Sequence, residues 1–187
     1  MNIEVEVKIE INNFEEIKTK VSEFGKLIKS IHQIDDYFIP SHRDFFAQKP
    51  QPTEWLRIRT NPDKVILEYD KAVNMQASGD YDYAEEYETV VSSPEELRKI
   101  LNFLDFKKAI TVDKQREYWD CGDIEIALDK IKGLGDFIEA EAKGDFKDAT
   151  MARQACLKLL EELGIKDVES KEIKKGYPVM LLEKNNE

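Results

Sequence analysis

Acidic and basic side chains alternate with apolar side chains along several extended segments of this chain. In Ile3–Ile9, three charged residues fall on one side of a strand and four apolar residues on the other. Carboxylates bind Mg²⁺ or Mn²⁺, whereas Lys and Arg bind phosphate oxygens. A polyphosphate that chelates one or two metal ions would therefore satisfy both kinds of side chain. The candidate set has seven carboxylates (Glu4, Glu6, Glu86, Glu88, Asp129, Glu139, Glu141) and six cations (Lys8, Arg57, Arg59, Lys71, Lys114, Arg116).

A single alternating segment is equally typical of a half-buried strand whose charged face meets solvent. The E-x-E pairs also occur at roughly the chance rate for a chain with this much Glu. The pattern becomes informative because five strands share it, and because R-x-R and K-x-R lie on strands between the E-x-E pairs. If the sheet curls into a barrel, these faces line a charged lumen, which must be wet and filled by ligand to avoid a large desolvation cost.

Hydrophobic periodicity predicts an α+β protein. Apolar residues at helical spacing indicate helices over Asn13–Phe24, from Ser93–Pro94 to Leu104, and over Asp148–Leu163, the last with Met151, Ala155, Leu159 and Leu163 facing inward. Residues 71–82 are interpreted as a long hairpin loop. Eight strands with few helical crossovers favour a mainly antiparallel sheet with helices outside. The predicted strands are Ile3–Ile11, Gln33–Ile39, Glu54–Thr60, Val65–Tyr69, Tyr83–Val91, Ile110–Trp119, Asp123–Leu128 and Asp136–Lys143.

Composition narrows the function. The chain of 187 residues has 28 Lys+Arg and 39 Asp+Glu, a net charge of −11, which argues against broad binding to nucleic acid or anionic lipid. Its length suits a single domain over residues 1–187, without linker, signal peptide or membrane span, and we expect it in the cytoplasm. Two cysteines and two histidines offer no disulfide framework, zinc spacing or Ser/His/Asp triad. Neither a P-loop nor G-x-G-x-x-G is present.

Six ordered motifs resemble those of the CYTH, or triphosphate-tunnel, superfamily of class IV adenylyl cyclases, thiamine triphosphatases and inorganic tripolyphosphatases. The resemblance covers nearly the whole chain. E-x-E-x-K alone is a weak signal, but the ordered set is specific. The motifs are Glu4-x-Glu6-x-Lys8, Gln33-x-Asp35-x-Tyr37-Phe38, Leu56-Arg57-x-Arg59, Glu86-x-Glu88-Thr89, Val112-x-Lys114-x-Arg116, and Leu128-Asp129 followed by Gly133-Leu134-Gly135 and Glu139-x-Glu141.

The resemblance implies an eight-stranded, mainly antiparallel closed β-tunnel with helices packed outside. It implies phosphate contacts from Lys8, Arg57, Arg59, Lys114 and Arg116, metal binding by Glu4, Glu6, Asp129, Glu139 and Glu141, and catalytic roles for Glu86, Glu88, Lys8 and Tyr37. Tyr37 would hydrogen-bond Lys8, although aromatic core packing explains Tyr37 and Trp55 equally well. Trp55, Lys174 and Lys175 would lie at the substrate mouth, with Gly176 where the related C-terminal segment has Ser. Cyclase relatives also suggest a homodimer.

One strand departs from the pattern. Where relatives have an L-T-Y-K-like run, this chain has Leu67-Glu68-Tyr69-Asp70-Lys71. A direct match puts Asp70 in place of a phosphate-binding Lys. Lys71 could take that role only after a one-residue shift or bulge, since such a shift moves a side chain to the other face.

The motifs do not separate the reactions of these relatives. A class IV cyclase converts ATP to cAMP and pyrophosphate, whereas a triphosphatase directs water at the terminal phosphorus of tripolyphosphate or thiamine triphosphate. Length and the E-Y-E-T, L-D-K-I-K-G-L-G and Y-P-V-M-L-L runs favour the cyclase type, with Mg²⁺ or Mn²⁺. The position of Trp55 before the L-R-x-R run is more similar to the pattern of thiamine triphosphatase, in which an aromatic residue can stack on a ring. The Asp70 departure leaves open a binding module without turnover, and a scaffold without ligand is the least favoured reading.

Overall fold

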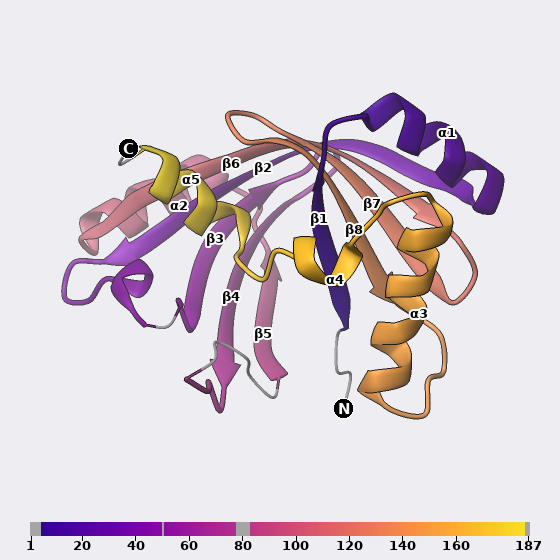
Figure 1. The fold of residues 1–187 in the computed structure, drawn as a ribbon. Coiled ribbons are helices and arrows are strands. Elements are labelled where there is room, and N and C mark those ends of the chain that lie inside the picture. Colours follow the sequence, from indigo (N-terminus) through magenta and orange to yellow (C-terminus); the bar gives the residue numbers. More distant parts are fainter. Residues whose placement is uncertain (1–4, 50, 78–82, 186–187) are drawn as a thin grey trace. The chain divides into compact units, whose positions relative to one another are not determined.

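The computed structural model describes residues 5–49, 51–77 and 83–185 (Figure 1). The chain forms two compact units. Unit 1 is drawn from residues 1–32 and 114–174, and unit 2 from residues 33–113 and 175–187. The prediction of a single domain over residues 1–187 stays a prediction.

The strands form one eight-stranded sheet in the order β1-β8-β7-β6-β2-β3-β4-β5. Neighbouring strands pair antiparallel in every register that the described residues define, which confirms the predicted α+β antiparallel sheet. Within the described residues the hydrogen-bonded order ends at β1 and at β5, so the closed tunnel is not confirmed. The strands are β1 (Glu6–Ile11), β2 (Lys26–Pro40), β3 (Glu54–Thr60), β4 (Val65–Val73), β5 (Tyr83–Val90), β6 (Phe106–Asp120), β7 (Ile124–Ile131) and β8 (Gly135–Ala142).

Strand lengths depart most from prediction at β2 and β6. Each has 15 residues, against seven predicted for β2 and ten predicted for β6, and each contributes residues to both units. β4 continues to Val73, so residues 71–73 are strand and the connection to β5 is shorter than predicted. Residues 78–82 of that connection lie outside the described residues.

The three predicted helices are present as α1 (Phe14–Phe24), α2 (Pro94–Phe103) and α3 (Ala149–Glu162). Asp148 caps α3, since its side chain accepts a hydrogen bond from the Met151 amide at 2.9 Å. Ser93 precedes α2 but its side chain makes no capping hydrogen bond, so Pro94 at the first position is the start signal that the structure uses. The sequence did not predict η1 (Phe45–Ala47), α4 (Val168–Lys171) and α5 (Tyr177–Asn185).

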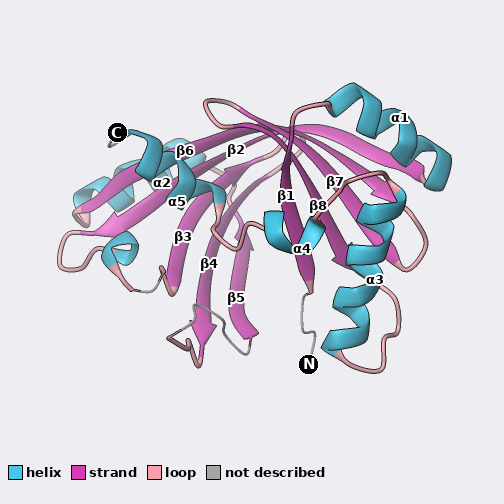
Figure 2. Ribbon diagram, viewed as in Figure 1, coloured by secondary structure: helices cyan, strands magenta, loops and turns pink. Residues whose placement is uncertain are grey.

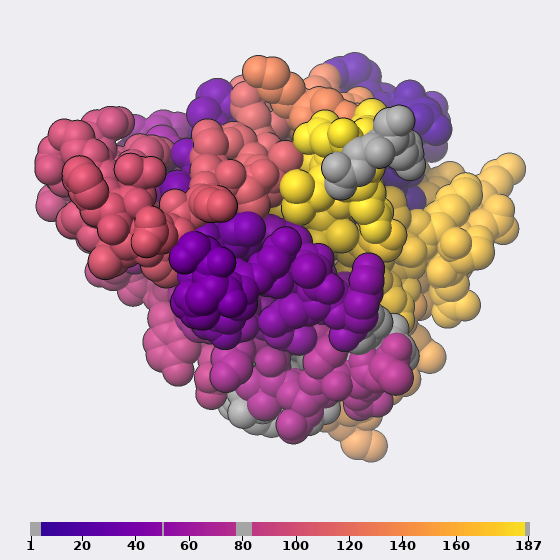
Figure 3. Space-filling view, turned by 90° about the vertical axis from the view of Figure 1, so that its left-hand side faces the viewer, coloured from indigo at the N-terminus to yellow at the C-terminus, as the bar shows by residue number. Residues whose placement is uncertain are grey.

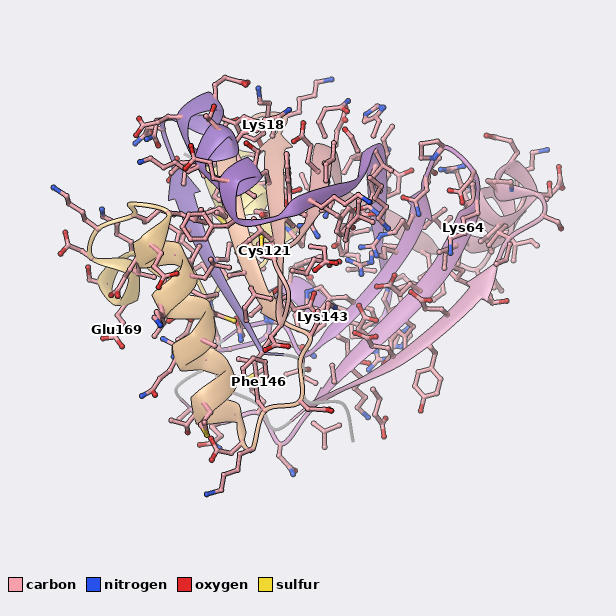
Figure 4. The ribbon with its side chains drawn as sticks, turned by 90° about the vertical axis from the view of Figure 1, so that its right-hand side faces the viewer. Lys18, Lys64, Cys121, Lys143, Phe146 and Glu169 are labelled. Atoms are coloured by element: carbon pink, nitrogen blue, oxygen red, sulfur yellow. The ribbon has the colours of Figure 1, made fainter. Side chains whose placement is uncertain are left out.

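In unit 1, α1 and α3 pack on the apolar face of β1, β7 and β8 (Figure 2). Val7, Ile9, Ile126 and Ile138, each at most 1% exposed, come from alternate positions of these strands, so the charged positions between them must face the other side. Cys121 and Phe146 lie beside this core, while Lys18 marks α1 and Glu169 marks α4 (Figure 4).

The predicted inward face of α3 is rotated. Met151 is half exposed, and Ala152, Cys156 and Leu160 are buried in its place. Leu163 is buried as predicted, and Ala155 and Leu159 pack at the margin of the core. The sequence allowed both assignments because Ala, Leu and Cys occupy two adjacent stripes of this helix.

Unit 2 has a smaller core of Phe38, Ile58 and Leu101, against which Leu97 and Phe106 pack. In the space-filling view, α2 and α5 both reach the surface of this unit (Figure 3). Phe103 at the end of α2 is 83% exposed, whereas Tyr177 and Leu181 of α5 are buried. No helix in the described part of the chain is both long and apolar enough to span a membrane.

Asp36 ties three elements of unit 2 together on the side of this core. Its carboxylate on β2 accepts hydrogen bonds from Thr111 of β6 at 2.7 Å, from Arg98 of α2 at 3.1 Å and from Lys108 at 3.3 Å. Desolvation by burial raises the pKa of Asp36, but these hydrogen bonds and the charge of Lys108 outweigh it, so the pKa lies below its usual range.

We therefore expect Asp36→Asn to lower the free energy of unfolding at pH 7 by about 1–3 kcal/mol. Because the folded-state pKa is lowered, the carboxylate contributes fully above its unfolded pKa of about 4 and loses that contribution as the pH falls below it. Urea unfolding at pH 7 and pH 3 should show a difference between wild type and variant that shrinks in acid. Glu96→Gln, at an exposed ion pair of α2, is the control, and a pH-independent difference would contradict the assignment.

Candidate functional site: two ionic sheet faces

The side of the unit 1 sheet opposite its apolar core carries a charged cluster, here called the unit 1 ionic face. Cross-strand partners share a face, and Glu6 pairs with Glu141, Lys8 with Glu139 and Arg116 with Asp129. Several of these side chains are buried, with Lys8 and Lys114 each 5% exposed and Asp129 fully buried. The described members of this face that the sequence predicted are Glu6, Lys8, Lys114, Arg116, Asp129, Glu139 and Glu141.

Arg116 links two strands of this face. Its Nε donates to Asp129 at 2.7 Å, and its Nη2 donates to both Asp129 and Glu139. One guanidinium therefore compensates two buried carboxylates from β7 and β8, which burial would otherwise destabilise. Glu141, two residues further along β8 on the same face, accepts a hydrogen bond from Lys143, which is labelled in Figure 4.

Glu6 has a perturbed titration. Desolvation raises its pKa and the neighbouring Glu139 raises it further, while Lys8 and Arg116 act in the opposite direction. The Glu6 side chain keeps an exposed surface, where water screens these charges. Glu6 is thus a carboxylate that holds a proton more readily than an ordinary surface Glu.

Carboxylate oxygens are the donors that Mg²⁺ and Mn²⁺ prefer, so the chemistry of Glu6, Glu139 and Glu141 fits such an ion. Among the described residues, however, no three Asp, Glu, His or Cys side chains converge in metal-binding geometry. Arg116 also contacts Glu139, which leaves fewer of its oxygens for an ion. Two predicted ligands remain. Asp129 accepts hydrogen bonds from Arg116, and its role as a metal ligand stays a prediction, while Glu4 lies outside the described residues.

Unit 2 carries a second cluster, the unit 2 ionic face, which is defined by cross-strand register. Asp35 pairs with Arg59 and Tyr37 with Arg57, while Arg57 also pairs with Glu68 on its other side. Further along, Asp70 pairs with both Trp55 and Glu86. The members are Asp35, Tyr37, Trp55, Arg57, Arg59, Glu68, Asp70, Glu86 and Glu88.

Two arginines organise this face. Arg59 grips Asp35 with two hydrogen bonds, from Nε at 2.9 Å and from Nη2 at 3.1 Å, and its Nη1 lies 3.3 Å from Glu68. Arg57 donates from Nη1 to the Tyr37 hydroxyl at 2.9 Å and from Nη2 to Glu68. Bidentate pairing fixes the orientation of a guanidinium more firmly than a single contact does.

Burial lowers the pKa of Arg57, but its interactions with Tyr37, Asp35 and Asp70 raise the pKa by more. The pKa of Arg57 is therefore raised, and Arg57 stays a cation. Burial raises the pKa of Tyr37, Asp35 adds to this effect, and Arg57 works against it, so the hydroxyl stays protonated. The hydrogen bond seen for Tyr37 joins it to Arg57, and its predicted bond to Lys8 stays a prediction.

Asp70 and Glu86 are adjacent carboxylates on β4 and β5. Desolvation raises the pKa of Asp70, with Glu88 adding to it and Arg57 and Arg59 opposing it. Desolvation also raises the pKa of Glu86, and Asp70 adds to that shift. Like charges directly opposite each other destabilise a strand pair, so this end of the face is strongly acidic.

The structure does not bring Lys71 to this face. The register of β4 runs without interruption from Val65 to Val73, with Lys71 opposite Glu54 and Glu85. Side chains alternate along a strand, so Lys71 points away from Arg57 and Glu68, and it is exposed. The one-residue shift that would have recruited Lys71 is therefore wrong.

Sequence reasoning missed Asp35 and Glu68, which are 1% and 3% exposed. The signal was available, because Asp35 alternates with Tyr37 and Glu68 alternates with Asp70. Trp55 lies on this face and is half-buried. Lys174 and Lys175 are exposed, and Lys175 pairs with Glu183 at 2.7 Å, so their role at a substrate mouth stays a prediction.

In each unit the fold presents cations and carboxylates together on one side of its antiparallel strands. The family model for the CYTH domain matches residues 2–176, so the chain belongs to the CYTH family. This confirms the family that the six motifs indicated.

Individual relatives agree with this membership. A protein of Methanocaldococcus jannaschii named "Putative adenylate cyclase" is 30% identical over 170 residues, which cover 87% of this chain and 90% of the relative. The structure of the PH1819 protein from Pyrococcus horikoshii is 30% identical, with a TM-score of 0.77 and coverage of 97% and 99% of the two chains. A Hippeastrum protein named "Putative adenylyl cyclase", reported to have a dominant triphosphatase activity, shares the fold at 15% identity, with a TM-score of 0.67 and coverage of 99% and 96%.

The electrostatics of unit 1 can be checked directly. We expect Glu139→Gln to lower the pKa of Glu6, because it removes the negative charge of Glu139. That charge is the second-largest cause of the raised pKa, behind desolvation. Carboxyl-detected NMR titration of Glu6 would measure the change. The control is Glu15→Gln, at an exposed position of α1, which should leave the pKa of Glu6 unaltered. An equal effect of both variants would show that Glu139 is not its electrostatic neighbour.

Proposed function

We propose that this CYTH protein is a metal-dependent enzyme that acts on a small molecule containing a triphosphate. The observation that carries the proposal is the unit 1 ionic face, where Lys8, Lys114 and Arg116 stand among Glu6, Asp129 and Glu139. Such a mixture is costly as a dry core but suits a phosphate chain and a hard cation. Membership of the CYTH family supports the same class of ligand.

In this proposal Lys8, Lys114 and Arg116 bind phosphate oxygens in unit 1, and Glu6, Glu139 and Glu141 hold a Mg²⁺ or Mn²⁺ ion, with Asp129 orienting Arg116. Once bound, the ion supplies neutralisation of the charge that develops on phosphate oxygens. The side chains do the remaining work by fixing the phosphate chain before reaction, which lowers the entropic part of the barrier.

In-line attack at phosphorus also needs a group that accepts the proton of the nucleophile. A carboxylate with a raised pKa is a better base than an ordinary one. Glu6 and Glu86 both have this property, the first through desolvation and Glu139, the second through desolvation and Asp70. In unit 2, the raised pKa of Glu86 agrees with the catalytic role predicted for Glu86 and Glu88, which stays a prediction.

The finer proposal is class IV adenylyl cyclase chemistry. The ribose 3′-hydroxyl of ATP forms a bond to the α-phosphorus and loses its proton, the bond from that phosphorus to the bridging oxygen breaks, and cAMP and pyrophosphate result. The name of the 30% identical M. jannaschii relative supports this reaction.

Hydrolysis of the terminal phosphate is the second candidate. The activity reported for the Hippeastrum protein supports it, as does Trp55, a half-buried aromatic residue on the unit 2 ionic face. Here water forms a bond to the terminal phosphorus and loses a proton, the bond from that phosphorus to the bridging oxygen breaks, and orthophosphate and the diphosphate compound result.

One substrate panel separates these reactions. Purified protein with Mg²⁺ or Mn²⁺ is offered ATP, tripolyphosphate and thiamine triphosphate in parallel. Formation of cAMP and pyrophosphate from ATP identifies the cyclase, and orthophosphate release alone identifies a hydrolase. Tight binding without product would identify a binding module and would overturn the proposal of an enzyme.

We expect Glu6→Gln and Glu139→Gln each to reduce metal-dependent turnover by about 100-fold or more, because each removes a charged ligand of the proposed ion. The control is Glu161→Gln, at an exposed position of α3, which should keep wild-type turnover. Circular dichroism would check that all three variants fold. Wild-type turnover in both site variants would contradict the metal assignment.

A further inference from the structure

The two arginines of the unit 2 ionic face are already engaged by carboxylates of the same face. Arg59 donates hydrogen bonds from Nε and Nη2 to Asp35, and Arg57 donates one from Nη1 to the Tyr37 hydroxyl. Each guanidinium therefore has an anchor of its own. The remaining terminal nitrogens, Nη2 of Arg57 and Nη1 of Arg59, both meet Glu68.

Glu68 thus bridges the two guanidinium groups with one carboxylate, Oε1 toward Arg57 and Oε2 toward Arg59 at 3.3 Å. This is the arrangement that a phosphate oxyanion would adopt between two arginines, since both anions present oxygens to planar N–H donors. Glu68 is only 3% exposed, so its charge depends on these two partners for compensation.

The contacts around Glu68 leave hydrogen-bonding capacity unused. Within the described part of the chain, the Oε2 of Glu68 makes no hydrogen bond of normal geometry, although it lies within ion-pair distance of Arg59. The Nε of Arg57 is also buried and has no hydrogen-bond partner among the residues that the structure describes. Neither Asp35 nor Tyr37 needs Glu68 in order to hold its arginine.

The surroundings add further negative charge. Asp70 lies 3.9 Å from Nη2 of Arg57, and Glu88 is the cross-strand partner of Glu68. Five carboxylates (Asp35, Glu68, Asp70, Glu86, Glu88) share this face with two arginines. A bare polyanion that approaches Arg57 and Arg59 therefore meets a net negative face, and like-charge contacts of this kind strongly disfavour binding.

We propose that Glu68 is a specificity-determining residue: it acts as an internal counter-anion for Arg57 and Arg59, so that this face accepts a phosphate group only when the ligand brings its own positive charge. The ligand class is a metal-chelated phosphate compound rather than the free polyanion. This inference rests on the proposed function, to which it adds the state of the ligand that the unit 2 ionic face accepts and the residue that selects it.

The experiment measures tripolyphosphate binding by calorimetry, once with excess Mg²⁺ and once with EDTA. We expect wild type to bind the Mg²⁺ complex and to bind free tripolyphosphate weakly. Glu68→Gln should strengthen binding of free tripolyphosphate by about tenfold or more, with a smaller change for the Mg²⁺ complex, because it removes a charge that competes with the anion.

Two further variants test the assignment. Glu54→Gln is the matched control: Glu54 lies in the same unit, is 6% exposed and pairs with Arg43 at 2.8 Å, but it is on the face that holds Lys71. It should leave free tripolyphosphate binding unchanged. The gain of Glu68→Gln should disappear in Glu68→Gln/Arg57→Met, because the gain requires the released guanidinium.

The outcomes separate a counter-anion from a structural clamp. A clamp predicts that Glu68→Gln weakens binding in both conditions, and that result, or an unchanged affinity for free tripolyphosphate, would overturn the inference. If Glu68→Gln does not fold, Glu68→Thr makes the same measurement with a smaller neutral side chain. If neither wild type nor any variant binds the Mg²⁺ complex, the proposed function itself is contradicted. If the Mg²⁺ complex binds but Glu68→Gln does not bind free tripolyphosphate more tightly than wild type, only the role of Glu68 is contradicted.

Discussion

The two-residue repeat of the extended backbone is the constraint on which the rest of this structure depends. Because successive side chains leave a strand on opposite sides, one row packs against helices while the other row faces away. In unit 1 the row that packs against helices contains Val7, Ile9, Ile126 and Ile138. Because these side chains are buried on one side of the sheet, the charged side chains between them must lie on the other side. The hydrophobic core thus positions the ionic face, and antiparallel pairing brings charges from different strands into contact.

The two ionic faces solve the problem of buried charge differently. In unit 1 a single guanidinium, Arg116, holds two carboxylates, while Lys8 and Lys114 supply further positive charge. In unit 2 two guanidinium groups share carboxylates and leave a surplus of acid beyond them. The predicted members of the unit 1 face are four carboxylates and three cations, whereas the unit 2 face has five carboxylates and two arginines. A phosphate compound and a cation are complementary to the first, and a ligand that carries both charges is complementary to the second.

Much of this arrangement was predictable because the pattern is local. Glu54–Thr60 was predicted with its observed ends, and the charged positions of β1, β6 and β8 followed from alternation alone. The helix starting at Pro94 and the cap at Asp148 were equally local signals. Prediction failed where two local readings were similar in energy. The inward stripe of α3 could have included Met151 or Cys156, and only packing against β1 and β8 selected Cys156.

The sequence by itself determined the family and the antiparallel sheet, because both depend on short-range periodicity and on the order of motifs, and from side-chain chemistry it proposed residues for phosphate and a hard cation. Only the tertiary structure decided which charges neutralise one another. Unbroken pairing of β4 with β3 and β5 sent Lys71 to the opposite side and placed Glu68 against Arg57 and Arg59. Register is a property of three strands together, and a one-residue difference in it exchanges the two faces, so residues of β4 alone could not reveal it.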